Sequence, residues 1–324
     1  MAQKKSRLVF FNNSFVKEEE AKVSIYDSSL MFGDMVFEMT RSFNQKQFKL
    51  KEHLERLILG AKILRIPIKF SIKEIERKCY ETIERNKPFF KKDDENRLLI
   101  EVSRGILDIY KQDTKLYKGP NLIIANFPLR WTVQKMGKLF DTGINCVITS
   151  QRAIPSRYLD SKIKNRNRIF YLMANIEASM FRGKNVWPIL LDDLGYIAEG
   201  SGDNFFIVKK NTIITPEGRN LLRGISRDYV INELAKKCGI SVIEKNIEPY
   251  DVYSADEAFI TATPFCMLPV VKLNELKVGN GKVGKIFNLL LQTWSKNVGL
   301  NIKNQIKKWN SNSKIKVSPY TFKK

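Results

Sequence analysis

Histidine is nearly absent from this chain, and its scarcity excludes several kinds of chemistry. Among 324 residues there is one histidine, His53. Most metal sites, and the Ser/His/Asp and Cys/His mechanisms, depend on histidine. Because His53 lies in a helical pattern that begins at Lys51, we expect it to be structural and expect no metal site. Unless His53 is itself the base, acid–base chemistry falls to lysine, a carboxylate or tyrosine.

Cysteines and long apolar runs are also scarce. The four cysteines, Cys79, Cys146, Cys238 and Cys266, stand far apart without CxxC spacing. This argues against a zinc site or a disulfide framework and fits a reducing cytoplasm. The apolar run from Leu8 to Phe11 is too short for a signal-peptide core or a membrane span. We therefore expect a soluble, cytoplasmic protein without a membrane partner.

Basic residues are abundant instead, giving a formal net charge of +22. Such an excess could attract nucleic acid, an anionic membrane surface or acidic small molecules. The lysines are spread over the whole chain and form no zinc-finger, RRM or basic-zipper pattern. We interpret them as solvated faces and expect no nucleic-acid partner. The basic, polar tail from Asn301 to Lys324 is expected to be mobile.

The chain is long enough for two domains, and its hydrophobic residues, at 43%, are numerous enough to form sizeable cores. The patterns predict an N-terminal α/β domain over 1–128 and a C-terminal domain over 144–324. Between them, the stretch 129–143 is polar and dotted with proline and glycine, which is typical of a linker.

Apolar periodicity predicts the elements. Alternation from Val36 to Phe43 predicts a half-buried strand with Phe37 and Arg41 on one face and Glu38 on the other. A hairpin and an amphipathic helix from Lys51 follow. The other predicted elements are helices at 72–86, 168–183, 226–237 and 283–298, and strands at 97–102, 122–127, 188–191, 204–208, 212–215 and 257–261.

Three segments carry groups that an anionic cofactor with a cationic ring would need: DSKIKNRNR (Asp160 to Arg168), YIAEGSGDNFF (Tyr196 to Phe206) and LLRGISRD (Leu221 to Asp228). A lysine of the first could form an imine with an aldehyde and move protons at the substrate carbon. The second places Glu199 at a strand end before a glycine-rich turn. In the third, Gly224 precedes a helix whose free N–H groups and dipole would attract a phosphate.

The order and spacing of these segments resemble the class IV aminotransferases, the family of branched-chain aminotransferases, D-amino-acid aminotransferases and aminodeoxychorismate lyases. The resemblance runs from about Ser24 to Val298 and includes YDSSLMFGDMVFE, HLERL, VSRG and TATPFCMLPV. It implies fold type IV in the α/β (α+β) class. A small N-terminal α/β domain, a larger C-terminal domain with a barrel-like sheet, and pyridoxal 5′-phosphate at the domain interface are then expected. A homodimer is implied as well.

The resemblance also implies roles for single residues. Lys164, which follows an isoleucine and precedes a helix containing Glu177-Ala178, matches the lysine that forms the imine, and Lys162 is its main rival. Glu199 matches the acid that pairs with the pyridine nitrogen and keeps it protonated. The other implied cofactor ligands are Arg56, Ile225, Ser226 and Thr263 at the phosphate, Leu222 at the ring face and Arg157 at the phenolic oxygen.

The substrate side departs from the family patterns. Phe37 stands where D-amino-acid aminotransferases carry a tyrosine, and the chain after Gly105 lacks their carboxylate-binding arginine and histidine. Branched-chain enzymes use backbone amides after the threonine, but Pro264 has no N–H. Their strand tyrosine and arginine are replaced by Arg97 and Leu99. Neither carboxylate-binding pattern is therefore complete.

Cationic side chains remain as candidates for the substrate carboxylate. Arg41 shares the predicted strand face of Phe37, and a charge on an apolar face needs a partner, which a substrate carboxylate would supply. A structural ion pair is the alternative for Arg41. Arg97 and Lys111 are further candidates.

These residues predict an aminotransferase that moves an amino group between an amino acid, or a related amine, and a 2-keto acid by a ping-pong mechanism. An aminodeoxychorismate lyase-like enzyme with the same cofactor is the alternative, although Glu38 replaces the threonine of those lyases. A basic nucleic-acid-binding protein is a remote alternative. The sequence leaves open the donor, the acceptor and the stereochemical preference.

Overall fold

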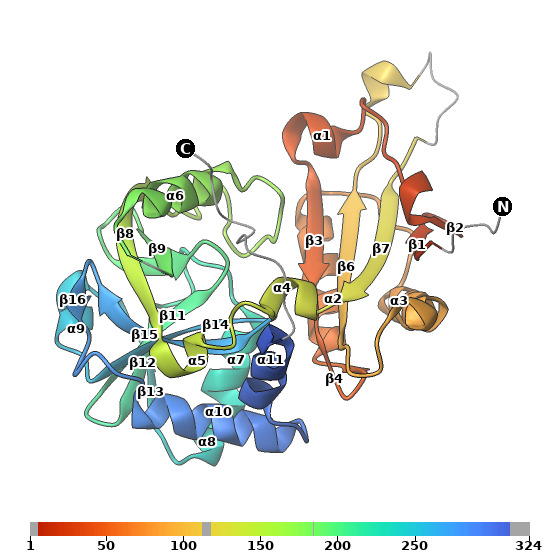
Figure 1. Ribbon diagram of the computed structural model, residues 1–324. Helices are drawn as coiled ribbons and strands as arrows, with labels where there is room; N and C mark the ends of the chain where they lie inside the picture. Colours follow the sequence, from red (N-terminus) through yellow and green to blue (C-terminus); the bar gives the residue numbers. More distant parts are fainter. Residues whose placement is uncertain (1–5, 112–117, 184, 312–324) are drawn as a thin grey trace. The chain divides into compact units, whose positions relative to one another are not determined.

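The chain folds into two compact units (Figure 1). The first comprises the chain up to Trp131 together with the segment Ile163–Asn167, and the second comprises Thr132–Lys162 and the chain from Arg168 onward. The sequence pattern divides the chain at 129–143 and contains no sign that the second segment of the first unit belongs there. The computed structural model describes residues 6–111, 118–183 and 185–311.

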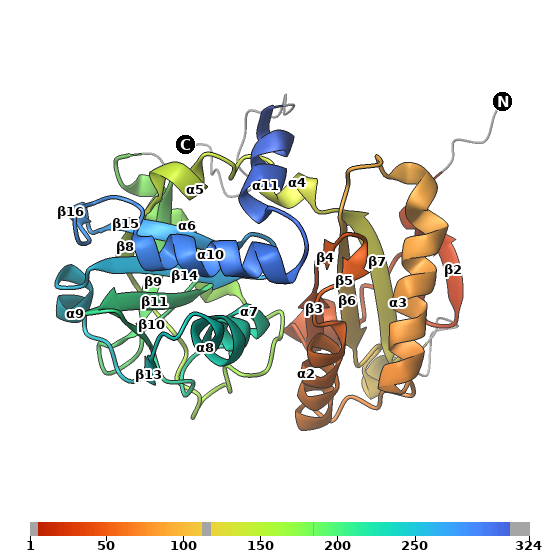
Figure 2. The ribbon, with the colours of Figure 1, turned by 90° about the horizontal axis from the view of Figure 1, so that it is seen from below.

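The first unit is an antiparallel sheet, in the order β2-β1-β7-β6-β3, with α2 and α3 side by side on one face (Figure 2). Leu54 and Leu57 of α2 and Ile75 of α3 are buried against Leu98 and Ile100 of β6. Its elements are β1 (Leu8–Phe11), β2 (Ser14–Lys17), η1 (Glu18–Glu20), α1 (Ser28–Phe32), β3 (Met35–Met39), β4 (Ser42–Phe43), β5 (Lys46–Gln47), α2 (Leu50–Ile63), α3 (Ile72–Asn86), η2 (Lys87–Phe89), β6 (Asn96–Ser103), η3 (Asp108–Tyr110) and β7 (Asn121–Pro128).

The strand predicted over 36–43 ends earlier than expected. β3 stops at Met39, and β4 pairs with β5 in a separate hairpin. The alternation that placed Arg41 on the face of Phe37 therefore does not extend to Arg41. The expectation of a half-buried strand is also wrong, because Phe37 and Glu38 are both buried.

The second unit is built on a closed sheet. Six strands follow one another in the order β10-β9-β8-β15-β14-β11, and β10 also pairs with β11, which closes the ring. Its elements are α5 (Leu139–Thr142), β8 (Ile144–Arg152), α6 (Ile169–Met180), β9 (Val186–Leu191), β10 (Ile197–Gly200), β11 (Asn204–Lys209), β12 (Thr212–Thr215), α7 (Ile225–Tyr229), η4 (Val230–Leu234), α8 (Ala235–Lys237), β13 (Val242–Glu244), α9 (Pro249–Tyr253), β14 (Glu257–Ala262), β15 (Cys266–Leu273), β16 (Leu276–Lys277), α10 (Lys285–Asn297) and α11 (Ile302–Ser311); α4 (Arg130–Val133) leads into this unit from the first.

Helices pack on this barrel-like sheet where apolar periodicity predicts them. α6 packs on β8 and β9, and α10 packs on β14. The segments α7, η4 and α8 form one helical run, which confirms the helix predicted over 226–237. Phe206 of β11 and Phe259 of β14 stack at 4.8 Å between ring centroids inside the unit.

Residues 302–311 of the C-terminal tail form the helix α11, contrary to expectation. Ile302, Ile306 and Trp309 lie on one side of α11 and are buried, because their spacing matches the helical repeat. The expectation of a mobile tail from Asn301 is therefore wrong for the α11 segment. Residues 312–324 lie outside the described residues.

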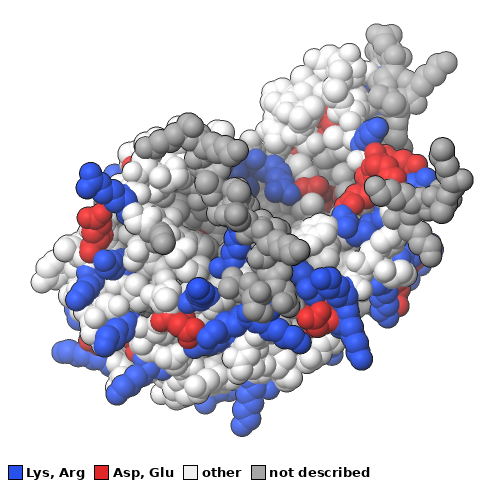
Figure 3. All heavy atoms as spheres, in the orientation of Figure 1, with Lys and Arg blue, Asp and Glu red and all other residues white. Residues whose placement is uncertain are grey.

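The charge excess is distributed over the surface. Figure 3 shows Lys and Arg side chains scattered over the visible face, with Asp and Glu among them. The absence of a nucleic-acid partner stays a prediction. Among the helices that the structure describes, none is long and apolar enough to cross a membrane.

Candidate active site

Lys164 lies in a short segment that is fixed against β3. Ile163 is buried in the apolar core of the first unit, and Asn165 forms an isolated antiparallel bridge with Val36. The N–H of Phe37 donates to the carbonyl oxygen of Lys164 at 3.0 Å. The Nζ of Lys164 lies 5.1 Å from the centroid of the Phe37 ring. The backbone of Lys164 is thus held in place on both sides of the residue.

A buried carboxylate links β3 to α2 near this lysine. Arg56 donates to Glu38 through Nε at 2.6 Å and through Nη2 at 2.9 Å, and His53 Nδ1 lies 2.7 Å from the same carboxylate. Burial alone would raise the pKa of Glu38, but Arg56 and His53 outweigh it and hold that pKa well below its usual range. Burial lowers the pKa of His53, which favours the neutral ring, and the charge of Lys164 acts in the same direction. The structure therefore brings Arg56 and Lys164 into one cluster.

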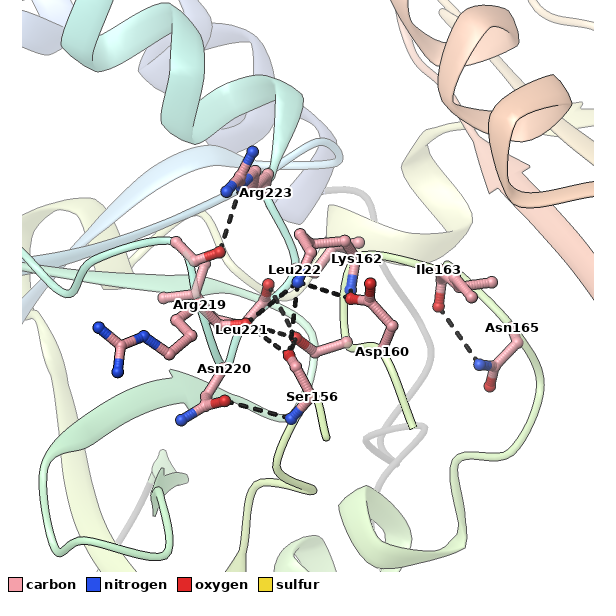
Figure 4. Close-up of polar contacts among 12 residues, drawn as sticks. Ser156, Asp160, Lys162, Ile163, Asn165, Arg219, Asn220, Leu221, Leu222 and Arg223 are labelled. Atoms are coloured by element: carbon pink, nitrogen blue, oxygen red, sulfur yellow. Dashed lines mark hydrogen bonds and ion pairs between the residues drawn. The ribbon is translucent and has the colours of Figure 1, made fainter. Parts of the chain in front are cut away.

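Lys162, the rival of Lys164, is engaged elsewhere. Its Nζ forms an ion pair with Asp160 at 2.7 Å and donates to the carbonyl of Arg219 at 3.3 Å. Figure 4 shows this amine among Asp160, Ser156 and the segment that contains Arg219. Its charge already has a partner within the second unit.

Glu199 lies on β10 and is buried, with both carboxylate oxygens hydrogen-bonded. Tyr171 of α6 donates from its hydroxyl to Oε1 at 2.5 Å. The N–H of Leu222 donates to Oε2 at 3.1 Å, and Nδ2 of Asn204 lies 3.5 Å from the same oxygen. Groups from α6, from β11 and from the loop before α7 thus fix the orientation of this carboxylate.

A second acid, Asp203, is buried beside Glu199. Burial and the negative charge of Glu199 raise the pKa of Asp203 to about 8. The same two causes raise the pKa of Tyr171 well above its usual value, so that its hydroxyl keeps its proton and remains a donor. At neutral pH the protonated form of Asp203 predominates.

The N-terminus of α7 lies close to Asn204. Gly224 precedes this helix, and a Cβ on Gly224 would lie 2.1 Å from the amide oxygen of Asn204. Only glycine therefore permits this approach. Ile225 and Ser226 occupy the first positions of α7, where backbone N–H groups have no partner within the helix. The arrangement suits an anion.

The remaining cofactor candidates lie apart in the second unit. Thr263 lies in the turn between β14 and β15. Nearby on β14, the buried hydroxyl of Thr261 has no hydrogen-bond partner within the described residues. Arg157 is exposed and forms an ion pair with Asp193 at 2.7 Å.

The cationic substrate candidates occupy different surroundings. Arg41 is 1% exposed, and its guanidinium carbon lies 3.8 Å from the centroid of the Phe43 ring. Arg97 is also buried, and its Nη2 lies 3.5 Å from the sulfur of Met39. Lys111 forms an ion pair with an exposed aspartate of η3. Among the predicted substrate residues, Phe37 lies beside Lys164.

Sequence reasoning missed two residues of this region. Tyr171 bonds to Glu199, and Arg166 lies over Phe37 at 3.8 Å from the ring centroid. Arg166 stands two positions after Lys164, and that proximity is the signal that could have drawn attention to it. No pattern in the sequence links Tyr171 to an acid 28 positions later.

A family model described as class IV amino-transferase matches residues 35–273, which is more than half of the chain. The chain belongs to the class IV aminotransferases. A putative branched-chain-amino-acid aminotransferase of Methanocaldococcus jannaschii is 36% identical to this aminotransferase over 279 residues, or 86% of this chain and 92% of that protein. The branched-chain-amino-acid aminotransferase of Escherichia coli K12 is 31% identical over 306 residues, which cover 91% of this chain and 94% of that protein.

Solved structures agree with this assignment. The branched-chain aminotransferase of Escherichia coli has a TM-score of 0.78 and 29% identity, covering 91% of this chain and 95% of that one. The T.th. branched-chain amino acid aminotransferase with pyridoxamine 5′-phosphate has a TM-score of 0.79 and 27% identity, covering 95% and 98%. This aminotransferase is thus a fold type IV transaminase, and its cofactor is pyridoxal 5′-phosphate. The family, fold type and cofactor expected from the sequence are confirmed.

Proposed function

We propose that this class IV aminotransferase exchanges an amino group between a branched-chain amino acid and a 2-keto acid by a ping-pong mechanism. The names of its relatives support the substrate class. The observation that carries the proposal is the segment around Lys164, whose backbone is fixed against β3 and whose amine lies beside Phe37.

Pyridoxal 5′-phosphate, when bound, supplies an aldehyde that joins an amine and a ring that accepts electrons from the substrate carbon. The residues of this chain fit such a group. Lys164 offers an amine, and Glu199 offers a buried acid fixed on both oxygens. The helix that begins after Gly224 offers backbone donors for a phosphate.

We assign catalysis to Lys164. Its amine would hold the cofactor between turnovers and, once the donor has taken its place, would move a proton away from the substrate carbon. The bond from the N–H of Phe37 to the carbonyl of Lys164 fixes the backbone from which this amine extends. Positioning of this kind is what a proton transfer requires.

Glu199 would keep the ring nitrogen protonated. Its carboxylate is oriented in advance by Tyr171 and by the N–H of Leu222, so it needs no reorganisation when charge develops in the ring. The side chain of Leu222 would lie against the ring face. Asp203, largely protonated at neutral pH, adds little charge of its own.

The phosphate would be held by Arg56, by the N–H groups and hydroxyl of Ile225 and Ser226, and by Thr263. The bidentate pair with Glu38 orients Arg56 for this role. Arg157 is bound to an exposed aspartate, and it would have to leave that partner to reach the phenolic oxygen.

We also propose a homodimer in the cytoplasm. Large apolar side chains are exposed on α1, including Leu30 and Phe32, and on α6, including Ile169 and Met180. Exposed apolar groups that gather on an element are typical of surfaces that bind a protein partner. Sedimentation of the cofactor-loaded protein should give twice the mass of one chain.

Half-reactions test the proposed function. Cofactor-loaded enzyme mixed with L-leucine, without any keto acid, should lose the absorbance of its aldehyde form and release the matching keto acid. Addition of 2-oxoglutarate should restore the absorbance and yield glutamate. D-Alanine and 1-phenylethylamine serve as donors of other classes. If L-leucine, L-isoleucine and L-valine all leave the absorbance unchanged, the proposed substrate class is wrong.

A further inference from the structure

Arg166 lies two residues after Lys164 and contacts the same aromatic ring. Its guanidinium carbon is 3.8 Å from the centroid of the Phe37 ring, and the Nζ of Lys164 is 5.1 Å from that centroid. A cation this close to an aromatic face is attracted by the ring electrons. The side chains of Arg166 and Lys164 therefore both lie close to the Phe37 ring, and the amine of Lys164 is the group that we assign to catalysis.

Glu101 sets the orientation of Arg166. It is the cross-strand partner of Phe37 in the pairing of β6 with β3. Arg166 donates to Oε1 of Glu101 through Nε at 3.1 Å and through Nη2 at 2.5 Å. Both bonds reach one carboxylate oxygen. Within the described part of the chain, Nη1 forms no hydrogen bond. Part of the guanidinium fork is left for another acceptor.

This guanidinium also differs in exposure from the arginines that the sequence suggests. The side chain of Arg166 is 34% exposed, whereas Arg41 and Arg97 are 1% and 7% exposed. A small anion can therefore reach Arg166 from solvent. Reaching Arg41 would require the removal of buried neighbours.

We propose that Arg166 binds the carboxylate of the amino-acid substrate, an inference that rests on the proposed function of Lys164. The amino group and the carboxylate of an amino acid share one carbon, so the carboxylate-binding cation must lie near the reacting amine. Arg166 meets this requirement, and its planar donors match a carboxylate. Because Pro264 has no backbone N–H to offer a carboxylate, a side-chain cation is needed in its stead.

Glu101 positions Arg166 but also competes with the substrate for it. Its negative charge partly neutralises the guanidinium and occupies two of its donors. A neutral glutamine at this position would keep the shape of the side chain and release part of the charge. Variants at the two positions should therefore change carboxylate binding in opposite directions.

The test measures binding of 4-methylvalerate, a carboxylate without an amino group, to cofactor-loaded enzyme by calorimetry. In Arg166→Gln the Kd should rise roughly 10- to 100-fold, the range for loss of a hydrogen bond between charged groups. Arg166→Lys should show a smaller rise, because it keeps the charge and loses the planar fork. In Glu101→Gln the Kd should fall several-fold.

Arg85 provides a matched control on α3. It also donates to one oxygen of a glutamate, Glu81, through Nε and Nη2, and it also lies over a ring, that of Phe15. Arg85→Gln should leave the Kd of 4-methylvalerate unchanged. In steady state, Arg166→Gln should raise KM for L-leucine more than it lowers kcat, and it should lose less activity with 3-methylbutylamine, which lacks a carboxylate, than with L-leucine.

Equal affinity of Arg166→Gln and the parent for 4-methylvalerate would overturn the proposal. Equal losses of Arg166→Gln activity with L-leucine and with 3-methylbutylamine would also overturn it, because they indicate a structural role for Arg166. If Arg166→Gln does not fold, Glu101→Gln decides, because unchanged or weaker binding contradicts the competition. If no branched-chain donor reacts but carboxylate binding changes as expected, the proposed function fails and the role of Arg166 in anion binding stands.

Discussion

Replacing Asp203 with asparagine removes a buried acid whose ionisation opposes folding. Burial and Glu199 raise the pKa of Asp203 from 3.8 to about 8. When folding raises the pKa of an acid, the protonated acid contributes stability to the folded protein. This stability is complete below the pKa of the acid in the unfolded chain, and it is lost as the pH rises through the pKa in the folded protein. From 3.8 to about 8 the difference is about 4 units, which at about 1.4 kcal/mol each gives an upper bound on the order of 6 kcal/mol. Since asparagine does not ionise, Asp203→Asn should stabilise the protein at alkaline pH.

Thermal melting of cofactor-loaded protein at two pH values measures this effect. Between about pH 5.5 and pH 8.5 the advantage of Asp203→Asn over the parent should grow by roughly 2 to 3 kcal/mol, or several degrees in Tm. Asp108→Asn, at an exposed position, is the control and should show no such growth. If the difference in Tm between Asp203→Asn and the parent is the same at both pH values, the raised pKa is wrong.

Two further substitutions test the buried pairs. Glu38→Gln leaves Arg56 without its countercharge and should lower the free energy of unfolding by about 3 to 5 kcal/mol. An unchanged midpoint of urea unfolding would contradict this expectation. Because the pKa of Glu38 is lowered from 4.5, its contribution in the parent is complete above that pH and is lost as the pH falls further. Tyr171→Phe removes a hydrogen bond to Glu199 that is worth about 1.5 to 3 kcal/mol. The variant should therefore lose pyridoxal phosphate at least 10-fold more readily on dialysis. Equal retention by variant and parent would refute the role of Tyr171 in orienting Glu199.

Local patterns allowed much of the fold to be predicted. The helical run after Gly224 was predictable because a glycine, a polar cap region and an apolar repeat agree on where a helix begins. The segments around Lys164 and Glu199 were recognisable because their order and spacing match those of the family. Fold type and cofactor follow from that match.

Contacts between distant parts of the chain were not predictable. Arg166 pairs with Glu101 across 65 positions, and nothing in either segment indicates the other. The position of Arg41 depends on where β3 ends. The strand stops at Met39, so Arg41 lies between β3 and the β4–β5 hairpin, a break that the alternation does not indicate. Tertiary packing, rather than the local pattern, decides such cases.

The identity of the lysine that carries the cofactor is the central claim, and one measurement tests it most directly. Cofactor-loaded protein is reduced with borohydride, digested, and its peptides are sequenced by tandem mass spectrometry. The cofactor-derived mass should lie on Lys164, with Lys162 unmodified, and Lys164→Ala should carry no such mass. A modified Lys162, or a reduced protein with no modified lysine, would contradict the account.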